Sequence, residues 1–104
     1  MKITCHCGRL IPDQTDGLPQ KAHVIPDQNW NQTWEQIDKV LRHLAGRKTS
    51  EEAAAMQLRR IVSRVTRIAY QCPDCGRLYL NDEQGKLHSY VPHDDGTSRT
   101  ILQS

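Results

Sequence analysis

The middle of the chain carries apolar residues at helical spacing in two successive stretches. The first runs from about residue 29 to about residue 45, with Asp27 or Asn29 as its expected cap and Gly46 as its end. Its apolar residues form one stripe: Trp30, Trp34, Ile37, Val40, Leu41 and Leu44. Because an apolar helical stripe usually packs in a core, we expect both tryptophans to be core anchors. The alternative is an exposed pair that stacks on bases or on a partner.

The second helical stretch begins after residue 48 and runs to about residue 68. Thr49 and Glu52 are three residues apart and form a capping-box pattern at its start. Its apolar face comprises Ala54, Leu58, Ile61, Val62, Val65, Ile68 and Ala69. Only residues 46–48 separate the two stretches, and so short a connection predicts two helices packed antiparallel.

Shorter apolar runs on either side of these helices predict β-strands. They occupy residues 2–4, 9–11, 21–25, 77–80 and 86–91. Pro12 and Pro26 end the second and third runs, and the Gly-containing segment 81–85 predicts a hairpin loop between the last two. The polar composition of residues 93–104 predicts a loosely held tail.

All four cysteines of the chain lie in two similar loops. Cys5 and Cys7 are followed by Gly8, and Cys72 and Cys75 are followed by Gly76, each time with Arg-Leu next. Thiolates two or three positions apart on a tight turn can bind one Zn²⁺ ion, which prefers four tetrahedral ligands. Glycine after the second cysteine accepts the positive φ that such a turn often needs. We therefore predict a single zinc site with four ligands: Cys5, Cys7, Cys72 and Cys75.

Other interpretations of the cysteines stay open at this point. His6 could replace one of the first two ligands, the chain could bind no metal, and iron could occupy a rubredoxin-like site in place of zinc. Disulfides are disfavoured because no apolar signal segment precedes Cys5, so the protein is expected in the reducing cytoplasm. A thioredoxin-like pair is disfavoured because Gly76 and a β-rich run, rather than a helix, follow Cys75.

The stretch from Tyr70 to Leu80, with Cys72-Pro73-Asp74-Cys75-Gly76 at its centre, resembles the metal-binding turn, or knuckle, of zinc-ribbon proteins. The whole chain resembles small uncharacterised bacterial proteins that carry a split ribbon. The resemblance covers roughly residues 3–11 and 68–92, and it implies a β-hairpin on each side of a zinc ion held by four cysteines. The sequence departs from the usual ribbon in its contracted first knuckle and in the 64 residues between Cys7 and Cys72.

These patterns together predict one α+β domain over residues 1–104. Residues 1–28 would hold the first knuckle and strands, 29–69 an inserted helical hairpin, 70–92 the second knuckle and its hairpin, and 93–104 a flexible tail. Hydrophobic residues make up only 37% of the chain and Phe is absent, so the core is small for the chain length. A structural metal would offset that deficit. No apolar run approaches the length of a membrane span, so we expect a soluble protein without a membrane partner.

The basic charge is concentrated in the middle of the chain. Residues 39–77 hold nine Lys or Arg against three Asp or Glu, although the net charge of the whole chain is only +2. The second helical stretch carries Arg60, Arg64 and Arg67 along one flank, and no acidic residue lies between Leu58 and Gln71. Such a flank is usually the solvated side of a helix, but a face of one sign can also bind phosphates or an acidic protein surface.

No enzymatic motif accompanies these features, and a site with four thiolates leaves no open coordination position. The first functional hypothesis is a non-catalytic, zinc-stabilised binding module whose partner is a nucleic acid or another protein. The alternative is a small ligand-binding protein or enzyme that uses the polar segment between Asp13 and Gln28. The polar residues of that segment are Asp13, Gln14, Asp16, Lys21, His23, Asp27 and Gln28.

Overall fold

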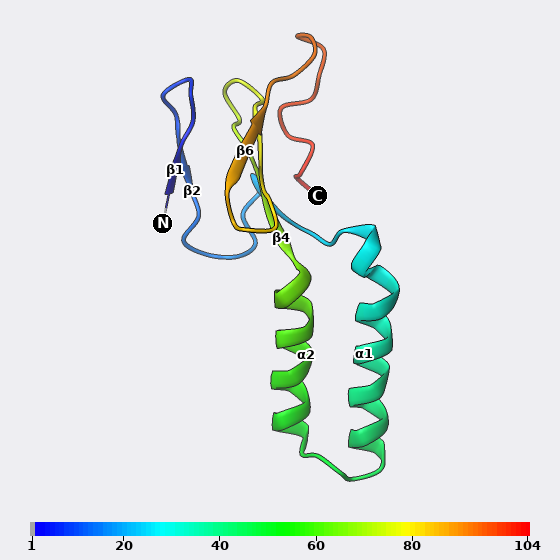
Figure 1. The fold of residues 1–104 in the computed structure, drawn as a ribbon. Coiled ribbons are helices and arrows are strands. Elements are labelled where there is room, and N and C mark those ends of the chain that lie inside the picture. The colour runs from blue at the N-terminus through cyan, green and yellow to red at the C-terminus, as the bar shows by residue number, and fades with distance from the viewer. Residues whose placement is uncertain (1) are drawn as a thin grey trace. The chain divides into compact units, whose positions relative to one another are not determined.

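The computed structural model describes residues 2–104, which form two compact units (Figure 1). The first unit contains the chain up to Val24 together with the segment from Arg67 to Ser104, and the second contains Ile25–Thr66. The strands belong to the first unit and the helices to the second. The sequence therefore leaves the β unit once, builds a helical hairpin, and returns to complete the sheet.

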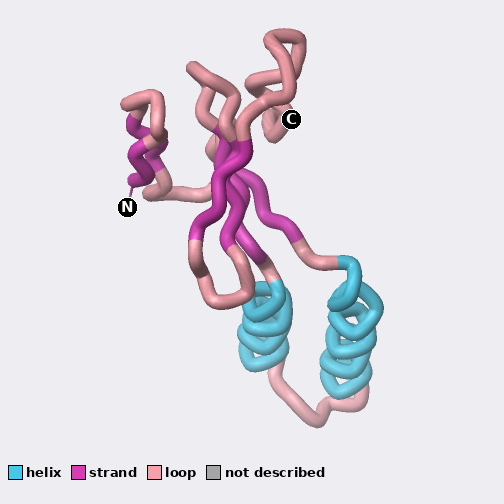
Figure 2. Tube along the Cα trace, turned by 45° about the horizontal axis from the view of Figure 1, so that its top comes forward, coloured by secondary structure: helices cyan, strands magenta, loops and turns pink. Residues whose placement is uncertain are grey.

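The β unit contains two antiparallel sheets. β1 (Lys2–Thr4) pairs with β2 (Leu10–Pro12), with Ile3 opposite Ile11. The second sheet has the order β3-β4-β5-β6, and its strands are drawn in magenta in Figure 2. Its strands are β3 (Lys21–Val24), β4 (Arg67–Gln71), β5 (Leu78–Asn81) and β6 (Leu87–Tyr90). These strands lie at the positions expected from the sequence to within one residue, except for β4.

The core of the β unit is small and includes two of the cysteines. Its buried members are Cys5, Ile11, Tyr70, Cys72 and Tyr79. Ile11 and Cys72 are fully buried. Because thiols take the place of larger hydrophobic groups here, the packing of this unit depends directly on the state of the cysteines.

The second unit is a helical hairpin of α1 (Asp27–Ala45) and α2 (Glu51–Val65), which run side by side in opposite directions (Figure 1). Its buried side chains include Thr33, Val40 and Ala54. The α+β fold class, with an antiparallel pair of helices, is confirmed. Among the described residues, neither helix is long and apolar enough to cross a bilayer.

The expectation that both tryptophans are core anchors is wrong. Trp30 is 46% exposed and Trp34 is 50% exposed, and their rings pack edge to face with centroids 5.8 Å apart. A helix with one helical neighbour buries a single narrow stripe, and in α1 Thr33 and Val40 occupy that stripe. The tryptophans lie at its margin, where they shield each other.

The expected ends of the helices also need correction. α2 stops at Val65 because Thr66 is extended (φ −80°, ψ 135°), and Arg67, Ile68 and Ala69 belong to β4 rather than to the helix. β4 pairs with β3 on one side and β5 on the other, so sheet hydrogen bonds replace the helical ones. The Thr49 capping box is absent from the described chain; Ser50 caps α2 instead and accepts a hydrogen bond from the Ala53 amide at 3.1 Å.

At the other helix, α1 begins at Asp27, two residues before the expected start, with Pro26 in the cap position. No side chain of the described residues caps it, so neither Asp27 nor Asn29 has that role. Gly46 ends α1 as expected, but the left-handed residue of the turn is Arg47, with φ +58°. The turn therefore reverses the chain without using the glycine for its positive φ.

Candidate metal centre

Each pair of cysteines lies in a turn closed by the same two backbone hydrogen bonds. Between β1 and β2, the Cys5 amide donates to the Arg9 carbonyl at 2.8 Å, and the Gly8 amide donates back to the Cys5 carbonyl at 2.9 Å. Between β4 and β5, the Cys72 amide donates to the Arg77 carbonyl at 2.9 Å, and the Gly76 amide donates to the Cys72 carbonyl at 2.8 Å. The two turns are thus structural equivalents.

The glycines of these turns adopt the left-handed conformation that the sequence predicts, with φ +97° at Gly8 and +79° at Gly76. Their surroundings differ. A Cβ atom at Gly8 would meet nothing within 4 Å, whereas one at Gly76 would lie 2.9 Å from Pro92 Cγ and 3.2 Å from Arg99 Cγ. The second turn is therefore covered by the residues that follow β6, and the first turn is open.

The two turns bring all four sulfur atoms together. Cys5 Sγ lies 3.5 Å from Cys75 Sγ, Cys7 Sγ lies 3.6 Å from Cys72 Sγ, and all four lie within 4.8 Å of one another. Four sulfurs around one Zn²⁺ at about 2.3 Å would be about 3.8 Å apart in a regular tetrahedron. All four cysteines, each within the described chain, are free thiols. The predicted ligand set is therefore positioned to hold one metal ion.

His6 is not part of this sulfur cluster. Its ring packs edge to face against the ring of Tyr79, with centroids 6.2 Å apart, and its backbone amide donates to the Tyr79 hydroxyl at 3.1 Å. The residue between Cys5 and Cys7 thus holds the tyrosine, which in turn contacts a ligand.

Two side chains donate hydrogen bonds to the sulfurs, one from β5 and one from the residue that precedes β5. The Tyr79 hydroxyl donates to Cys5 Sγ at 3.3 Å, and the Arg77 guanidinium donates to Cys75 Sγ at 3.4 Å. Such donors orient ligands and stabilise negative charge on thiolates. Tyr79 thus lies against a ligand sulfur, while Tyr90 on the neighbouring strand is exposed.

The thiols have different acidities because their surroundings differ. Burial tends to raise the pKa of Cys5, but hydrogen bonds from the Tyr79 hydroxyl, the Cys7 amide and the neighbouring thiols lower the pKa to about 6. At Cys72, burial raises the pKa to about 12. The protein alone therefore favours one ionised sulfur beside a protonated one, and a bound cation would favour the thiolate form of both.

The tail is fastened to the second turn at two points. The Gln71 side chain, which is buried, donates to the Ser98 carbonyl at 2.9 Å and accepts from the Ile101 amide at 2.9 Å. The Arg99 guanidinium donates to the Asp74 carbonyl at 2.7 Å. These bonds hold residues 98–101 over the turn that carries Cys72 and Cys75; the mobility of the rest of the tail stays a prediction.

A family model described as a domain of unknown function, DUF8617, matches residues 1–94. The chain belongs to this family. The matched span contains all four cysteines, both helices and the six strands, and residues 95–104 lie outside it. No curated protein and no solved structure matches the chain.

Part of the polar segment of this DUF8617 chain forms a network around Lys21. Lys21 Nζ lies 2.9 Å from Asp13 Oδ1 and 3.0 Å from Asp16 Oδ1, and it also donates to the Thr15 carbonyl. The Tyr70 hydroxyl donates to the other oxygen of Asp13. Burial tends to raise the pKa of Asp13, but the bonds from Tyr70 and Lys21 lower it below its usual value. Burial and the bond to Asp13 raise the pKa of Tyr70 to about 12.

The other residues of the polar segment lie in different places. His23 Nε2 is 3.6 Å from Asp16 Oδ1 at the edge of the network, and Gln14 is exposed. Asp27 and Gln28 form the first turn of α1 and belong to the helical unit. The structure thus gathers four of the seven residues (Asp13, Asp16, Lys21 and His23) and assigns the last two to another unit.

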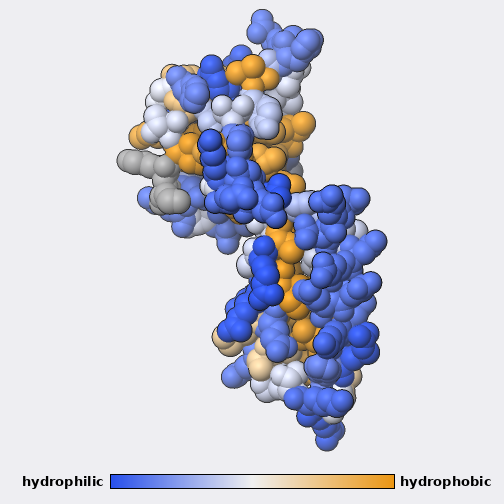
Figure 3. All heavy atoms as spheres, viewed as in Figure 1, coloured by the Kyte–Doolittle hydropathy of each residue, from blue (hydrophilic) through white to orange (hydrophobic). Residues whose placement is uncertain are grey.

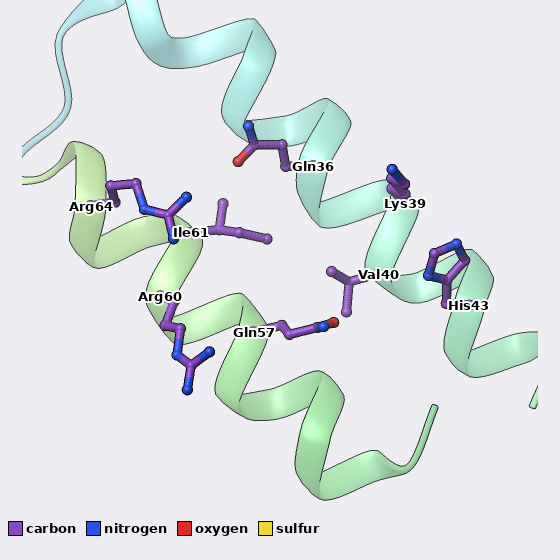
Figure 4. A pocket seen from close by; sticks show the side chains of 8 residues that line it. All are labelled: Gln36, Lys39, Val40, His43, Gln57, Arg60, Ile61 and Arg64. Carbon is purple, nitrogen blue, oxygen red and sulfur yellow. The ribbon is translucent and has the colours of Figure 1, made fainter. Parts of the chain in front are cut away.

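The predicted arginine flank is likewise divided. Arg60 and Arg64 lie one turn apart on α2, but Arg67 lies in β4 of the other unit. In place of Arg67, Arg60 and Arg64 share a groove between the helices with Lys39 and His43 of α1 (Figure 4). The sequence signal for these two residues is their spacing of four, which puts both on one side of α2.

Proposed function

We propose that this protein is a non-catalytic binding module stabilised by one structural Zn²⁺ ion, with Cys5, Cys7, Cys72 and Cys75 as the four ligands. The observation that carries the proposal is the cluster of four sulfurs within 4.8 Å, drawn from turns that are 65 or more residues apart in sequence. These four sulfurs alone supply the four ligands of a tetrahedral site.

The chemistry of the donor set favours zinc in a structural role. Four thiolates close the coordination shell, so the ion has no position left for water or substrate. Iron accepts the same four ligands, and metal analysis separates the two. Because Cys5 and Cys72 belong to the small core of the β unit, metal binding adds directly to folding. In zinc-finger peptides this contribution is on the order of 10 kcal/mol.

The alternative function, a ligand-binding protein or enzyme that uses the Asp13–Gln28 segment, has less support. The ammonium group of Lys21 already contacts three oxygen atoms of its own segment, and Asp13 is tied to both Lys21 and Tyr70. A lysine that forms two hydrogen bonds and two ion pairs within its own segment is suited to fixing a loop rather than to binding substrate. Because Lys21 and Asp13 already bind groups within the protein, a structural role for the network is favoured.

The test of the zinc proposal is metal analysis of the purified chain. We expect about one zinc per chain, and a chelator should lower the midpoint of urea unfolding markedly. Cys72→Ser should lose the metal, whereas His6→Ala should keep it, because the His6 ring is outside the sulfur cluster. A wild-type protein that is folded without metal, or that carries iron, would overturn the proposal.

The partner of the module is either a nucleic acid or another protein. The metal centre does not distinguish them, because its four sulfurs would all bind the ion, and Arg77 and Tyr79 already donate their hydrogen bonds to those sulfurs. The distinguishing surface is in the helical unit.

A further inference from the structure

The helical hairpin contains a shallow groove of about 490 Å³ that lies wholly within the second unit. Its floor is apolar, with Val40 from α1 and Ile61 from α2. Its rims carry six polar side chains, three from each helix (Figure 4): Gln36, Lys39, His43, Gln57, Arg60 and Arg64. Figure 3 shows the apolar strip between the two helices with hydrophilic side chains on both sides.

Every ionisable side chain on these rims is basic. The acidic residues of α1 and α2 do not line the groove: Asp27, Glu35, Asp38, Glu51 and Glu52. Within the described hairpin, no carboxylate forms an ion pair with Lys39, Arg60 or Arg64. By contrast, the ion pairs of the β unit use Arg9 and Lys21. The groove is therefore a site of uncompensated positive charge.

The spacing of these charges carries a small energetic penalty. Arg60 and Arg64 are four residues apart on one helix, a separation at which like charges destabilise an isolated helix by about 0.2–0.5 kcal/mol. A bound anion would convert this repulsion into attraction.

The length of the groove matches a short run of phosphates. On each helix the lining residues span seven positions, or about 10 Å: from Gln36 to His43 on α1 and from Gln57 to Arg64 on α2. Over that length one strand of B-DNA carries about three phosphates.

We propose that this groove binds the phosphate backbone of a nucleic acid, with Lys39, Arg60 and Arg64 contacting successive phosphates. The guanidinium groups are suited to bidentate contacts with phosphate oxygens, and the amides of Gln36 and Gln57 can donate at either end. The inference rests on the proposed function only in taking the protein to be a binding module, and it does not require the zinc.

The lining favours a nucleic acid over an acidic protein. Protein interfaces are usually centred on apolar or aromatic anchors that become buried. Here the apolar floor consists of two aliphatic side chains, of which Val40 is only 7% exposed and Ile61 is half-buried, and no aromatic ring other than His43 lines the groove within the described chain. What the groove offers is a row of cationic and amide donors, which suits a backbone of repeated phosphates.

The experiment measures the affinity of the zinc-loaded full chain for three labelled probes over a range of salt concentrations. The probes are a 20-base-pair DNA duplex of mixed sequence, a 20-nucleotide single-stranded RNA and a 20-residue polyglutamate. The test variant is Arg60→Gln/Arg64→Gln. The matched control is Arg42→Gln/Arg59→Gln, which removes the same charge from exposed positions of the same hairpin outside the groove.

We expect DNA or RNA to bind with a steep salt dependence, because each phosphate contact releases counterions. Losing two contacts should reduce the slope of log K against log salt by about 1.8 for the DNA duplex and about 1.4 for the single-stranded RNA, which weakens binding at 0.1 M salt about 60-fold and about 25-fold, respectively. The control should stay within about fivefold of the wild type, because it changes only the general field of the hairpin. Far-UV circular dichroism should show the same helix content in both variants.

Three results would overturn the inference. The first is a folded, zinc-loaded protein that binds neither nucleic acid, and the second is equal loss of affinity in the groove and control variants. The third is polyglutamate binding as tight as that of the nucleic acids, which would assign the groove to an acidic protein instead. Metal content measured on the protein as purified keeps the two proposals apart, since a wild-type protein that is folded without zinc and still binds nucleic acid would refute only the zinc proposal.

Discussion

Gly8 and Gly76 occupy equivalent positions after the second cysteine of each turn, so alanine substitutions at the two sites form a matched pair. Both residues have positive φ, and forcing alanine into that region costs about 1–2 kcal/mol. Alanine also restricts the unfolded chain, which returns about 0.4–1 kcal/mol where the native backbone accepts it. The backbone cost of alanine is therefore similar at the two sites. If φ were the only difference, Gly8→Ala would be the more destabilising change, because φ is +97° at Gly8 and +79° at Gly76.

The surroundings of the two glycines predict the opposite order. At Gly76 the new methyl group would lie 2.9 Å from Pro92 Cγ, and the rigid proline ring cannot rotate away. Overpacking of this kind costs about 1–3 kcal/mol. At Gly8 the methyl group meets nothing within 4 Å. We therefore expect Gly76→Ala to destabilise the protein by about 1–3 kcal/mol more than Gly8→Ala.

Urea unfolding of the zinc-loaded variants measures this difference. A double-mutant cycle locates its cause: in a Pro92→Ala background, Gly76→Ala should lose most of its excess effect, because the colliding ring is gone. Equal destabilisation by Gly8→Ala and Gly76→Ala, or an excess that survives in the Pro92→Ala background, would refute the reasoning.

Two further predictions concern the buried tyrosines. Tyr70→Phe should destabilise the protein below pH 10. Because the folded pKa of Tyr70 is raised to about 12, the gap from wild type should close as pH rises from 10 to 12, which urea unfolding at several pH values can follow. Tyr79→Phe removes the hydroxyl bonded to Cys5 Sγ and should weaken zinc binding by about tenfold in a chelator competition. Tyr70→Phe is its control and should weaken zinc binding less, because the Tyr70 hydroxyl bonds to Asp13 and not to a sulfur; an equal loss in both would argue against a specific role for Tyr79.

The sequence by itself determined the features that depend on local geometry. The spacing of Cys72 and Cys75 with Gly76 identifies the second turn, because only a few residues have to adopt a fixed conformation. The helical periodicity identifies both helices of the hairpin, and the Gly-containing segment 81–85 identifies the turn between β5 and β6. Each of these signals is complete within a dozen or so residues.

The tertiary structure alone decided features that require distant segments to meet. Ile68 and Ala69 fit the apolar stripe of α2, yet β3 and β5 supply hydrogen-bond partners on both sides and draw them into a strand. The link from Asp13 to Tyr70 spans 57 residues, and no local pattern encodes it.

The helical groove has the same origin. Periodicity shows which side of each helix is polar, but only the packing of α1 against α2 brings Lys39 and His43 to the groove that Arg60 and Arg64 share. The same packing decides how much of each helix's apolar stripe is buried, and it leaves Trp30 half exposed. Side-chain spacing along one helix is set by the backbone, whereas the distance between two helices is set by the balance of all their contacts.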